Sequence, residues 1–409
     1  MTVRFWVFCG HILFGFMKIA ILTSGILPVP AVQGGAVETL IDYCLEYNNT
    51  SKQHDITVFS VYHPLVKQTQ HLVSDVNHYH YIDVTSLWAK VKKRIHGLTH
   101  RHTYYHYTID YFLQQTLKEI ERRSYDVIIL ENRPGFALDL QGRTKAKLVY
   151  HLGNDFLNKD TPHAVELYES AWRIITTSDY IRQCVMSCNP ADAKCITVYN
   201  GIDLKPYQTA TPISRESLGF AEDDFVLAFS GRLTPEKGIM ELIEAMLLLH
   251  DKPNIKLLVM GSSFYENADK DNPFIHELKT RAKQLDNRIK FTGYIKHELM
   301  PSYLAAADAA VIPSTWQEPF GLTVVEAMAA GLPIITTDRG GIPEIVSKEN
   351  AIMIPLCSDF CGILAKAILS AYINKAGRLY MGQASRSLAK KFSKEIYAEQ
   401  YFRAIGIIR

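Results

Sequence analysis

Short apolar runs alternate with longer stretches of helical periodicity along most of the chain. Such alternation is typical of doubly wound parallel sheets, because a chain that leaves one parallel strand must cross back before it starts the next. Residues 205–224, of mixed polarity with two prolines, interrupt the alternation and predict a linker, with a domain boundary near residue 205. The predicted strands are residues 18–23, 56–61, 126–130, 147–152 and 173–177 before this boundary, and residues 225–230, 256–260, 288–292, 309–313 and 333–336 after it.

Residues 5–16 form an apolar and aromatic run directly ahead of the first predicted strand. The run is too short to span a bilayer and has no small-residue cleavage pattern, so a signal peptide is the poorer interpretation. We expect residues 1–16 to be a loosely attached extension or a mis-assigned start, with Met17 as the true first residue.

Composition narrows the class of protein. The 409 residues, 47% of them apolar, provide for two hydrophobic cores. Because 44 basic residues nearly balance 42 acidic ones, we expect no nucleic-acid partner. Seven cysteines without the spacing of a disulfide framework predict a cytoplasmic protein.

Two carboxylates stand around a predicted helix start in residues 318–333. The unpaired amides at such a start, near Gly321, bind anions, and a glycine lets a ligand approach the backbone closely. Glu326, one turn into the helix, would accept hydrogen bonds from a ribose diol, whereas Glu318 on the preceding loop would face a transferred sugar. The alternative is a capped helix with surface glutamates.

Three segments, taken together, resemble a known family. Residues 318–333 contain Glu, seven residues and Glu, followed by small residues and Gly-x-Pro; residues 230–238 read Ser-Gly-Arg-Leu-Thr-Pro-Glu-Lys-Gly; and Gly34 and Gly35 lie in the loop after the first strand. Over roughly residues 17–375 the chain is similar to the retaining glycosyltransferases of family 4. The resemblance implies the GT-B fold, an α/β fold of two facing Rossmann-like doubly wound domains with the active site in an interdomain cleft.

The resemblance also implies a role for each part of the chain. The expected parts are the extension 1–16, an N-terminal acceptor-side domain at 17–205, a C-terminal nucleotide-sugar-binding domain at 206–375, and helices at 376–409 that return toward the first domain. The expected donor-binding residues are Gly34, Gly35, Arg232, Lys237, Phe320, Gly321, Leu322, Thr323 and Glu326.

Arg232 and Lys237 supply the positive charge that the predicted donor site needs. A departing nucleoside diphosphate gains negative charge, and an enzyme without a metal must neutralise it with fixed cations and oriented amides. Both side chains come from one loop, so both can reach one diphosphate. Since no Asp-x-Asp motif follows a predicted strand, we expect no metal and no cofactor besides the nucleotide-sugar co-substrate.

Two further predicted strand ends carry polar residues. The carboxyl ends of parallel strands border the ligand site in open α/β sheets. His151 lies at such an end, where members of the family also place a histidine, so the resemblance implies a catalytic role; a structural histidine is the alternative. The residues expected on the acceptor side are Glu131, Arg133, Asn154 and Asp155.

Retaining transfer allows two interpretations of Glu318. It could be a covalent nucleophile in a double displacement. Alternatively, the acceptor attacks the face that the phosphate leaves, and the leaving oxygen takes the acceptor proton. We favour the second interpretation, in which Glu318 holds sugar hydroxyls and stabilises an oxocarbenium-like state.

The resemblance predicts transfer of a hexose or N-acetylhexosamine from a nucleotide sugar, with a UDP-sugar favoured, to a glycan or lipid-linked acceptor in bacterial polysaccharide biosynthesis. Residues 88–107, basic and aromatic at helical spacing, are either an ordinary surface helix or a peripheral contact with the anionic inner membrane face. The loop after the first strand lacks Gly-x-Gly-x-x-Gly, which argues against a nicotinamide dehydrogenase. Two alternatives remain: a nucleotide-sugar epimerase, and a non-catalytic GT-B protein with a structural or surface-coat role.

Overall fold

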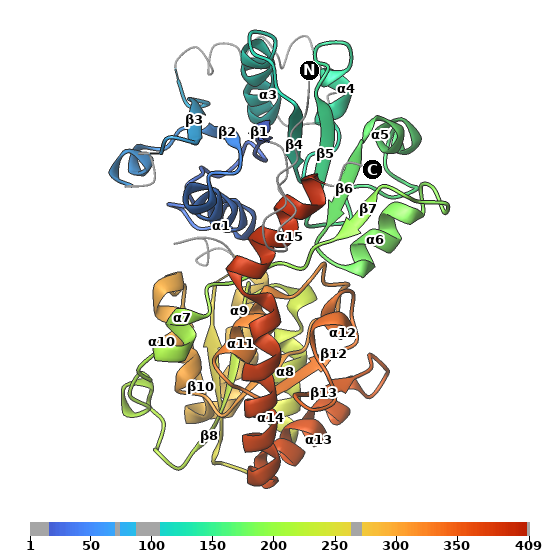
Figure 1. Cartoon of the computed structure of the whole chain (residues 1–409). Coiled ribbons are helices and arrows are strands. Elements are labelled where there is room, and N and C mark those ends of the chain that lie inside the picture. Colours follow the sequence, from blue (N-terminus) through green and yellow to red (C-terminus); the bar gives the residue numbers. More distant parts are fainter. Residues whose placement is uncertain (1–15, 70–73, 87–106, 263–271, 407–409) are drawn as a thin grey trace, which may run out of the picture. The chain divides into compact units, whose positions relative to one another are not determined.

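The chain divides into two compact units (Figure 1). The first unit combines Met1–Tyr199 with Glu395–Arg409, and the second comprises Asn200–Lys394. The domain limits drawn from the sequence stay a prediction. The computed structural model describes residues 16–69, 74–86, 107–262 and 272–406.

The first unit is built on a seven-stranded sheet whose paired strands run parallel, in the order β3-β2-β1-β4-β5-β6-β7. In the centre, Ile21 pairs with Val58 on one side and with Ile129 on the other. Parallel strands are buried on both faces, so they appear in the sequence as continuous apolar runs. The strands are β1 (Lys18–Leu22), β2 (Asp55–Val61), β3 (Asn77–Ile82), β4 (Val127–Glu131), β5 (Lys147–Leu152), β6 (Arg173–Thr176) and β7 (Cys195–Thr197).

Helices cover both faces of this sheet. Because successive side chains of a strand point to opposite faces, Ile19 and Ile21 pack with α1 (Ala36–Ser51) and α15 (Lys394–Gly406). Ala20 and Leu22 belong to the core on the other face. The helices that contribute to that second core are α3 (Tyr107–Ile120), α4 (Phe136–Leu140), α5 (Ala164–Ser170) and α6 (Asp179–Met186).

The second unit is built on a six-stranded parallel sheet in the order β10-β9-β8-β11-β12-β13. The order reverses at β8, so the loops after β8 and β11 leave neighbouring strands in opposite directions. Open α/β sheets bind ligands at such a switch point. The strands are β8 (Phe225–Ser230), β9 (Ile255–Met260), β10 (Ile289–Gly293), β11 (Ala309–Ile312), β12 (Ile334–Thr337) and β13 (Ala351–Ile354).

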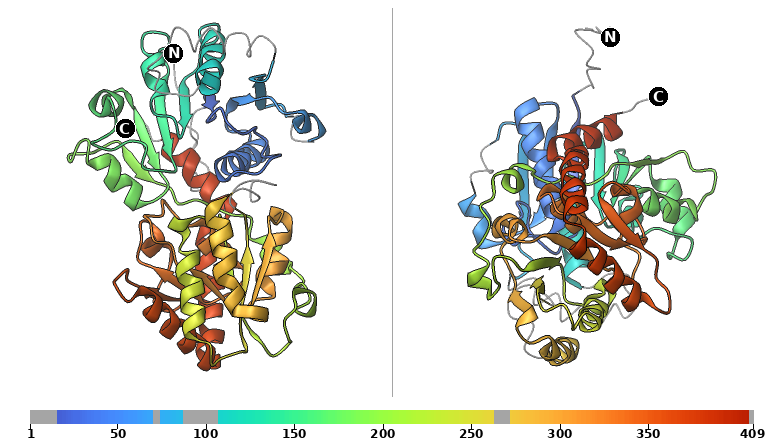
Figure 2. Two further views of the ribbon diagram at one scale, coloured as in Figure 1. Left: turned by 180° about the vertical axis from the view of Figure 1, so that it is seen from behind. Right: turned by 90° about the horizontal axis from the view of Figure 1, so that it is seen from below.

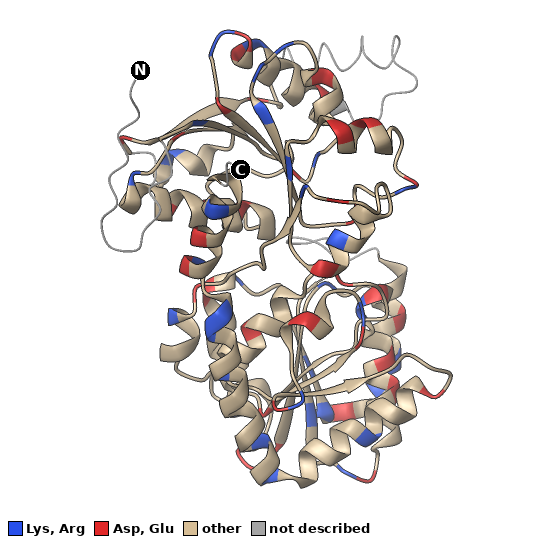
Figure 3. Ribbon diagram, turned by 45° about the vertical axis from the view of Figure 1, so that its right-hand side comes forward, with Lys and Arg blue, Asp and Glu red and all other residues tan. Residues whose placement is uncertain are grey.

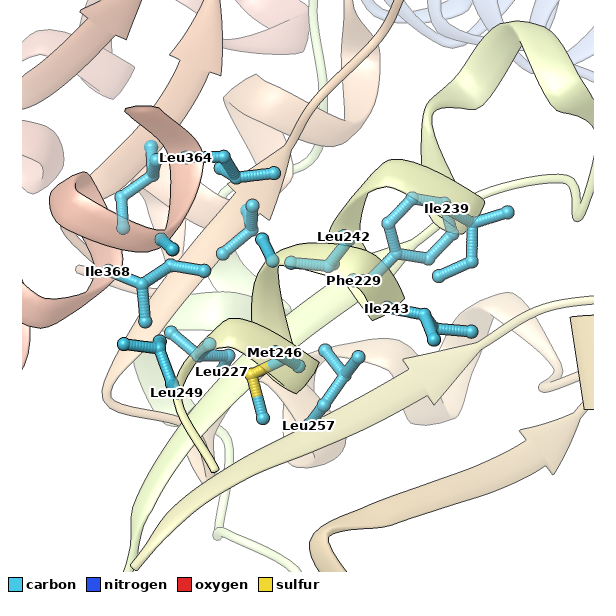
Figure 4. Close-up of a cluster of buried hydrophobic side chains, with 14 of the residues drawn as sticks. Leu227, Phe229, Ile239, Leu242, Ile243, Met246, Leu249, Leu257, Leu364 and Ile368 are labelled. Carbon is cyan, nitrogen blue, oxygen red and sulfur yellow. The ribbon is translucent and has the colours of Figure 1, made fainter. Parts of the chain in front are cut away.

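The main core of the second unit lies between the sheet and three helices, α8 (Ile239–Leu248), α9 (Pro273–Ala282) and α13 (Phe360–Ile373). Figure 4 shows Leu242 and Met246 of α8 between the strands and α13. Figure 1 shows α14 in front of the sheet, and the left view of Figure 2, from behind, shows α8 and α9 there. The remaining helices are α7 (Lys205–Thr209), α10 (Met300–Ala305), α11 (Leu322–Ala329), α12 (Ile342–Ile345) and α14 (Lys375–Ala389).

The predicted fold class is confirmed: both units are α/β with parallel sheets, and each predicted strand forms within one residue of its expected ends. Among the described residues, the prediction missed three strands, β3, β7 and β13, and all three lie at sheet edges. An edge strand is partly solvated, so polar residues interrupt its apolar run. The predicted linker 205–224 also contains the short helix α7.

Figure 3 shows acidic and basic residues interspersed over the helices and loops of both units. Within the described ranges, no helix is long and apolar enough to cross a membrane. The expectations for residues 1–16 and 88–107 fall almost wholly outside the described residues and stay predictions.

Candidate active site

A pocket of about 250 Å³ opens in the second unit where β8 and β11 end and α11 begins. It unites four residues that the sequence predicted for the donor and the catalytic site, although they come from two distant segments. Two cations and one carboxylate give its wall a positive balance, which suits a dianionic group such as a diphosphate. The lining residues are Phe229, Ser230, Gly231, Arg232, Lys237, Ile312, Glu318 and Thr323.

Glu318 is held by two partners on the pocket wall. The Lys237 ammonium lies 2.6 Å from its Oε1, and the Ser314 hydroxyl donates to the same oxygen at 2.7 Å. The ammonium also lies 5.7 Å from the centre of the Trp316 ring. Because the Glu318 side chain is only 9% exposed, these partners fix its orientation before any ligand arrives.

Close backbone contacts bring the two loops of the pocket together. The carbonyl oxygen of Glu236 accepts hydrogen bonds from the Ser314 hydroxyl and from the Thr315 amide. Gly238, at a φ of +68°, lies so near the Pro313 carbonyl that a Cβ would overlap it. Gly340, at a φ of +59°, lies equally near the backbone of Glu318. Glycine is required at both positions, since it accepts positive φ and leaves room for the neighbouring backbone.

The start of α11 is a glycine turn. Gly321 has a φ of 108°, and the helix runs from Leu322 to Ala329. The first amides of a helix have no partner within it, and Thr323 in this first turn lines the pocket. The Phe320 ring is only 2% exposed and packs against Phe392, 6.0 Å between ring centres, so its side chain belongs to the core.

Glu326 has a partner that the sequence analysis missed. Nε2 of His297 lies 3.1 Å from Oε1 of Glu326, and the Glu326 side chain is 12% exposed. The hydrogen bond to Glu326 raises the pKa of His297 above its ordinary value, despite partial desolvation. His297 stands in no motif, and one of fifteen histidines gives no signal of its own in the sequence.

The first unit holds a second group of predicted residues. Nδ1 of His151 lies 2.7 Å from Oε2 of Glu131, and the Tyr401 hydroxyl donates to Oε1 of Glu131 at 3.0 Å. The His151 side chain is 5% exposed, and its Nε2 has no hydrogen-bond partner within the described parts of the chain. Burial, followed by the charge of Glu131, raises the pKa of Tyr401, which therefore remains a neutral donor.

A buried carboxyl lies beside the predicted Gly34 and Gly35 loop. Glu38, in the first turn of α1, is 4% exposed, and its carboxyl group lies where a Cβ on Gly35 would be. Burial is the main cause that raises the pKa of Glu38 to about 7, and the charge of Glu131 adds to it. The hydroxyl of Ser24 lies 3.5 Å from Oε1 of Glu38.

The other acceptor-side candidates are Arg133, Asn154 and Asp155. Nε of Arg133 donates to the carbonyl oxygen of Ser24 at 3.3 Å. Asn154 is half-buried and Asp155 is exposed, in the loop that follows β5. The roles predicted for these residues from the sequence stay predictions.

Three comparisons bear on the class of protein. Residues 211–387 match the family described as "Glycosyl transferases group 1". A putative glycosyltransferase YtcC of Bacillus subtilis is 29% identical over 374 residues, which are 88% of this chain and 84% of the relative. Spore coat protein SA of the same organism is 29% identical over 346 residues, 81% of this chain and 84% of the relative.

Among solved structures, Anabaena Alr3699/HepE in complex with UDP-glucose is similar with a TM-score of 0.71. The two chains are 22% identical, and the match covers 95% of this chain and 99% of that one. At this identity the likeness establishes the fold. The family match of residues 211–387, the two relatives and the fold together support a glycosyltransferase of the GT-B fold.

Proposed function

We propose that the chain is a retaining, metal-independent hexosyltransferase of family 4. It transfers a hexose or N-acetylhexosamine from a nucleotide sugar, with UDP-sugar as the favoured donor, to a glycan or lipid-linked acceptor in bacterial polysaccharide biosynthesis. The likeness to a UDP-glucose complex supports the choice of uridine, and the residues of the pocket support a diphosphate-bearing ligand.

The observation that carries this proposal is the convergence of Arg232, Lys237 and Glu318 on one pocket with the start of α11. The two cations and the helix amides would neutralise the diphosphate as it leaves. Glu326 would hold the ribose, because its carboxylate lies one turn into the same helix.

Transfer would then proceed on one face of the donor sugar. The bond between the anomeric carbon and the phosphate oxygen breaks, the acceptor oxygen forms a bond to that carbon, and the acceptor proton passes to the leaving phosphate oxygen. Glu318 would bind sugar hydroxyls and stabilise the positive charge that develops on the ring. Because Lys237 and Ser314 already hold this carboxylate, it would need little reorganisation.

His151 would contribute on the acceptor side of the reaction. Its buried Nε2, which the described residues leave without a hydrogen-bond partner, is the atom that would bond a sugar hydroxyl. The Glu131 carboxylate on Nδ1 would fix the tautomer and the ring orientation.

A second candidate is a non-catalytic role in a surface coat. The observation in its favour is the 29% identity with Spore coat protein SA over most of both chains. Against it stand Arg232, Lys237 and Glu318, which meet at one pocket, since a structural protein has no need of all three.

The test is donor hydrolysis. The purified protein is incubated with UDP-, GDP- and ADP-sugars, with EDTA and without, and release of the nucleoside diphosphate is measured. We expect slow release from one donor, unaffected by EDTA and lost in Glu326→Ala. No release from any donor, together with no calorimetric binding of the nucleotides, would favour the coat role.

A further inference from the structure

The structure pairs Glu326 with His297, a residue that no motif singles out. His297 begins the 3₁₀ turn His297–Leu299, just after β10, while Glu326 lies in α11. Nε2 of the imidazole is 3.1 Å from Oε1 of the carboxylate. The contact therefore joins the loop after β10 to the helix that begins at the pocket.

The two side chains differ in solvent exposure. The His297 side chain is 62% exposed, whereas the Glu326 side chain is 12% exposed. The exposed partner remains open to a ligand or to water, and the buried one depends on its neighbours for orientation. An ion pair with a solvent-exposed partner such as His297 is screened by water and stabilises a fold little, so stability gives no strong reason for this pair.

A hydrogen bond to one oxygen of a carboxylate orients the other. The terminal torsion of a glutamate side chain is broad, so a carboxylate without a partner samples many orientations. The imidazole Nε2–H donates to Oε1, because a carboxylate can only accept, and this leaves Oε2 for a second donor. The raised pKa of His297 agrees with a contact that persists near neutral pH.

We propose that His297 is a positioning residue for the donor nucleoside: it holds the Glu326 carboxylate in the orientation that receives the ribose hydroxyls. This inference rests on the proposed function, in which Glu326 binds the ribose. His297 acts through Glu326 and has no part in bond cleavage. Its substitution should therefore weaken donor binding. The contact between Glu326 and the ribose is equally strong in the ground state and in the transition state, so the rate of bond cleavage should change little.

The first experiment measures binding of UDP to the wild-type protein, His297→Ala and His297→Gln by calorimetry. We expect UDP to bind about fivefold to tenfold more weakly to the alanine variant, the loss of roughly one oriented hydrogen bond. Glutamine places an N–H near the position of Nε2, so it should restore most of the affinity. In donor hydrolysis, KM should rise by a similar factor while kcat changes by less than about twofold.

Two further arms test that the effect passes through Glu326 and the ribose. The same His297→Ala change in a Glu326→Ala background should weaken UDP binding no further. With 2′-deoxy-UDP, which lacks a ribose hydroxyl, the wild-type protein and His297→Ala should bind nearly alike. His276→Ala, at an exposed histidine of α9, is the matched control and should bind UDP as the wild type does.

Failures of the two proposals are distinguishable. Unchanged UDP binding in His297→Ala overturns the role of His297, and so does an equal loss of UDP affinity when the same change is made in the Glu326→Ala background. Either result leaves the proposed glycosyltransferase function standing. A fall in kcat without a rise in KM also overturns the role of His297. If the wild-type protein binds none of UDP, GDP and ADP, the proposed function fails and this inference fails with it.

Discussion

The predicted site residues form two groups that differ in their surroundings. In the second unit, Arg232, Lys237 and Glu318 line an open pocket, and the carboxylate is balanced by a cation. In the first unit, Glu131 and His151 are almost fully buried, and a neutral tyrosine completes their hydrogen bonds. Both groups stand at the carboxyl ends of parallel strands, so the same architecture supports an accessible charged site and a closed polar network. The difference predicts that substitutions in the first group change activity with little effect on stability, whereas those in the second also lower stability, because they disturb buried hydrogen bonds.

The largest effect is expected at Glu318. Glu318→Gln keeps the size of the side chain and the hydrogen bond from Ser314, but it removes the negative charge that Lys237 balances. We expect kcat for donor hydrolysis to fall about a hundredfold or more, with little change in thermal stability. Initial rates of nucleotide release measure the effect, with the exposed Glu349→Gln as control. Full activity in the glutamine variant would contradict the role, and a trapped glycosyl-enzyme at Glu318 would replace same-face attack by double displacement.

Gly340 tests whether the backbone sets the position of Glu318. A Cβ at this positive-φ residue would overlap the Glu318 backbone. We expect Gly340→Ala to lower the rate of donor hydrolysis at least about tenfold and to destabilise the second unit by about 1–3 kcal/mol. Gly219→Ala is the control, because Gly219 has a φ of 82° and no atom of the described residues lies within 4 Å of its Cβ position. Equal behaviour of the two variants would mean that positive φ, rather than overlap with Glu318, causes the loss.

Tyr401 probes the buried network of the first unit. Tyr401→Phe removes the hydroxyl that donates to Glu131 and leaves a buried carboxylate oxygen without that donor. The free energy of unfolding should fall by about 1–3 kcal/mol. Urea denaturation measures it, against Tyr380→Phe at an exposed tyrosine of α14. An unchanged midpoint would show that water replaces the hydroxyl without cost.

Glu38 gives a smaller effect that depends on pH. Burial raises its pKa from 4.5 to about 7, so between these values the folded state binds more protons than the unfolded state. The stability contributed by the neutral carboxyl is therefore lost as pH rises through this window. Glutamine cannot ionise, so the stability of Glu38→Gln relative to the wild type should rise by about 1–2 kcal/mol from pH 5 to pH 7.

Melting temperatures of the two proteins across this pH range measure the Glu38 effect. Burial lowers the pKa of His54 to about 4, which makes stability rise with pH over part of the same range. Because His54 is present in both proteins, its contribution cancels in the difference between them. A difference that stays constant from pH 5 to pH 7 would show that Glu38 is ionised in the folded protein.

Much of the second unit could be predicted from local sequence. Residues 230–238 and 318–326 each contain both a turn and the polar groups it presents, so a short segment specifies a wall of the pocket. The contact between Lys237 and Glu318 follows once their two strands are neighbours in the sheet. The pairing of His297 with Glu326 could not be predicted. It joins the loop after β10 to the helix α11, and the periodicity of a sequence does not describe contacts between a loop and a distant helix.

The first unit depended more on the tertiary structure. The sequence predicted Glu131 and His151 as separate strand ends, but not their burial, nor that Tyr401, 270 positions beyond Glu131, completes the network. It also missed the edge strand β3, where polar and aromatic residues alternate instead of forming an apolar run.

By itself, the sequence determined the two parallel sheets and the residue types at their strand ends, because the periodicity of buried strands and the conformational needs of turns are local properties. Which of those polar groups lie on an open pocket and which are closed in the interior was decided by the tertiary structure alone. Burial and hydrogen-bond partners come from helices and loops far away in the chain. They set the orientation of Glu318, the raised pKa of Glu38 and the pairing of Glu326 with His297.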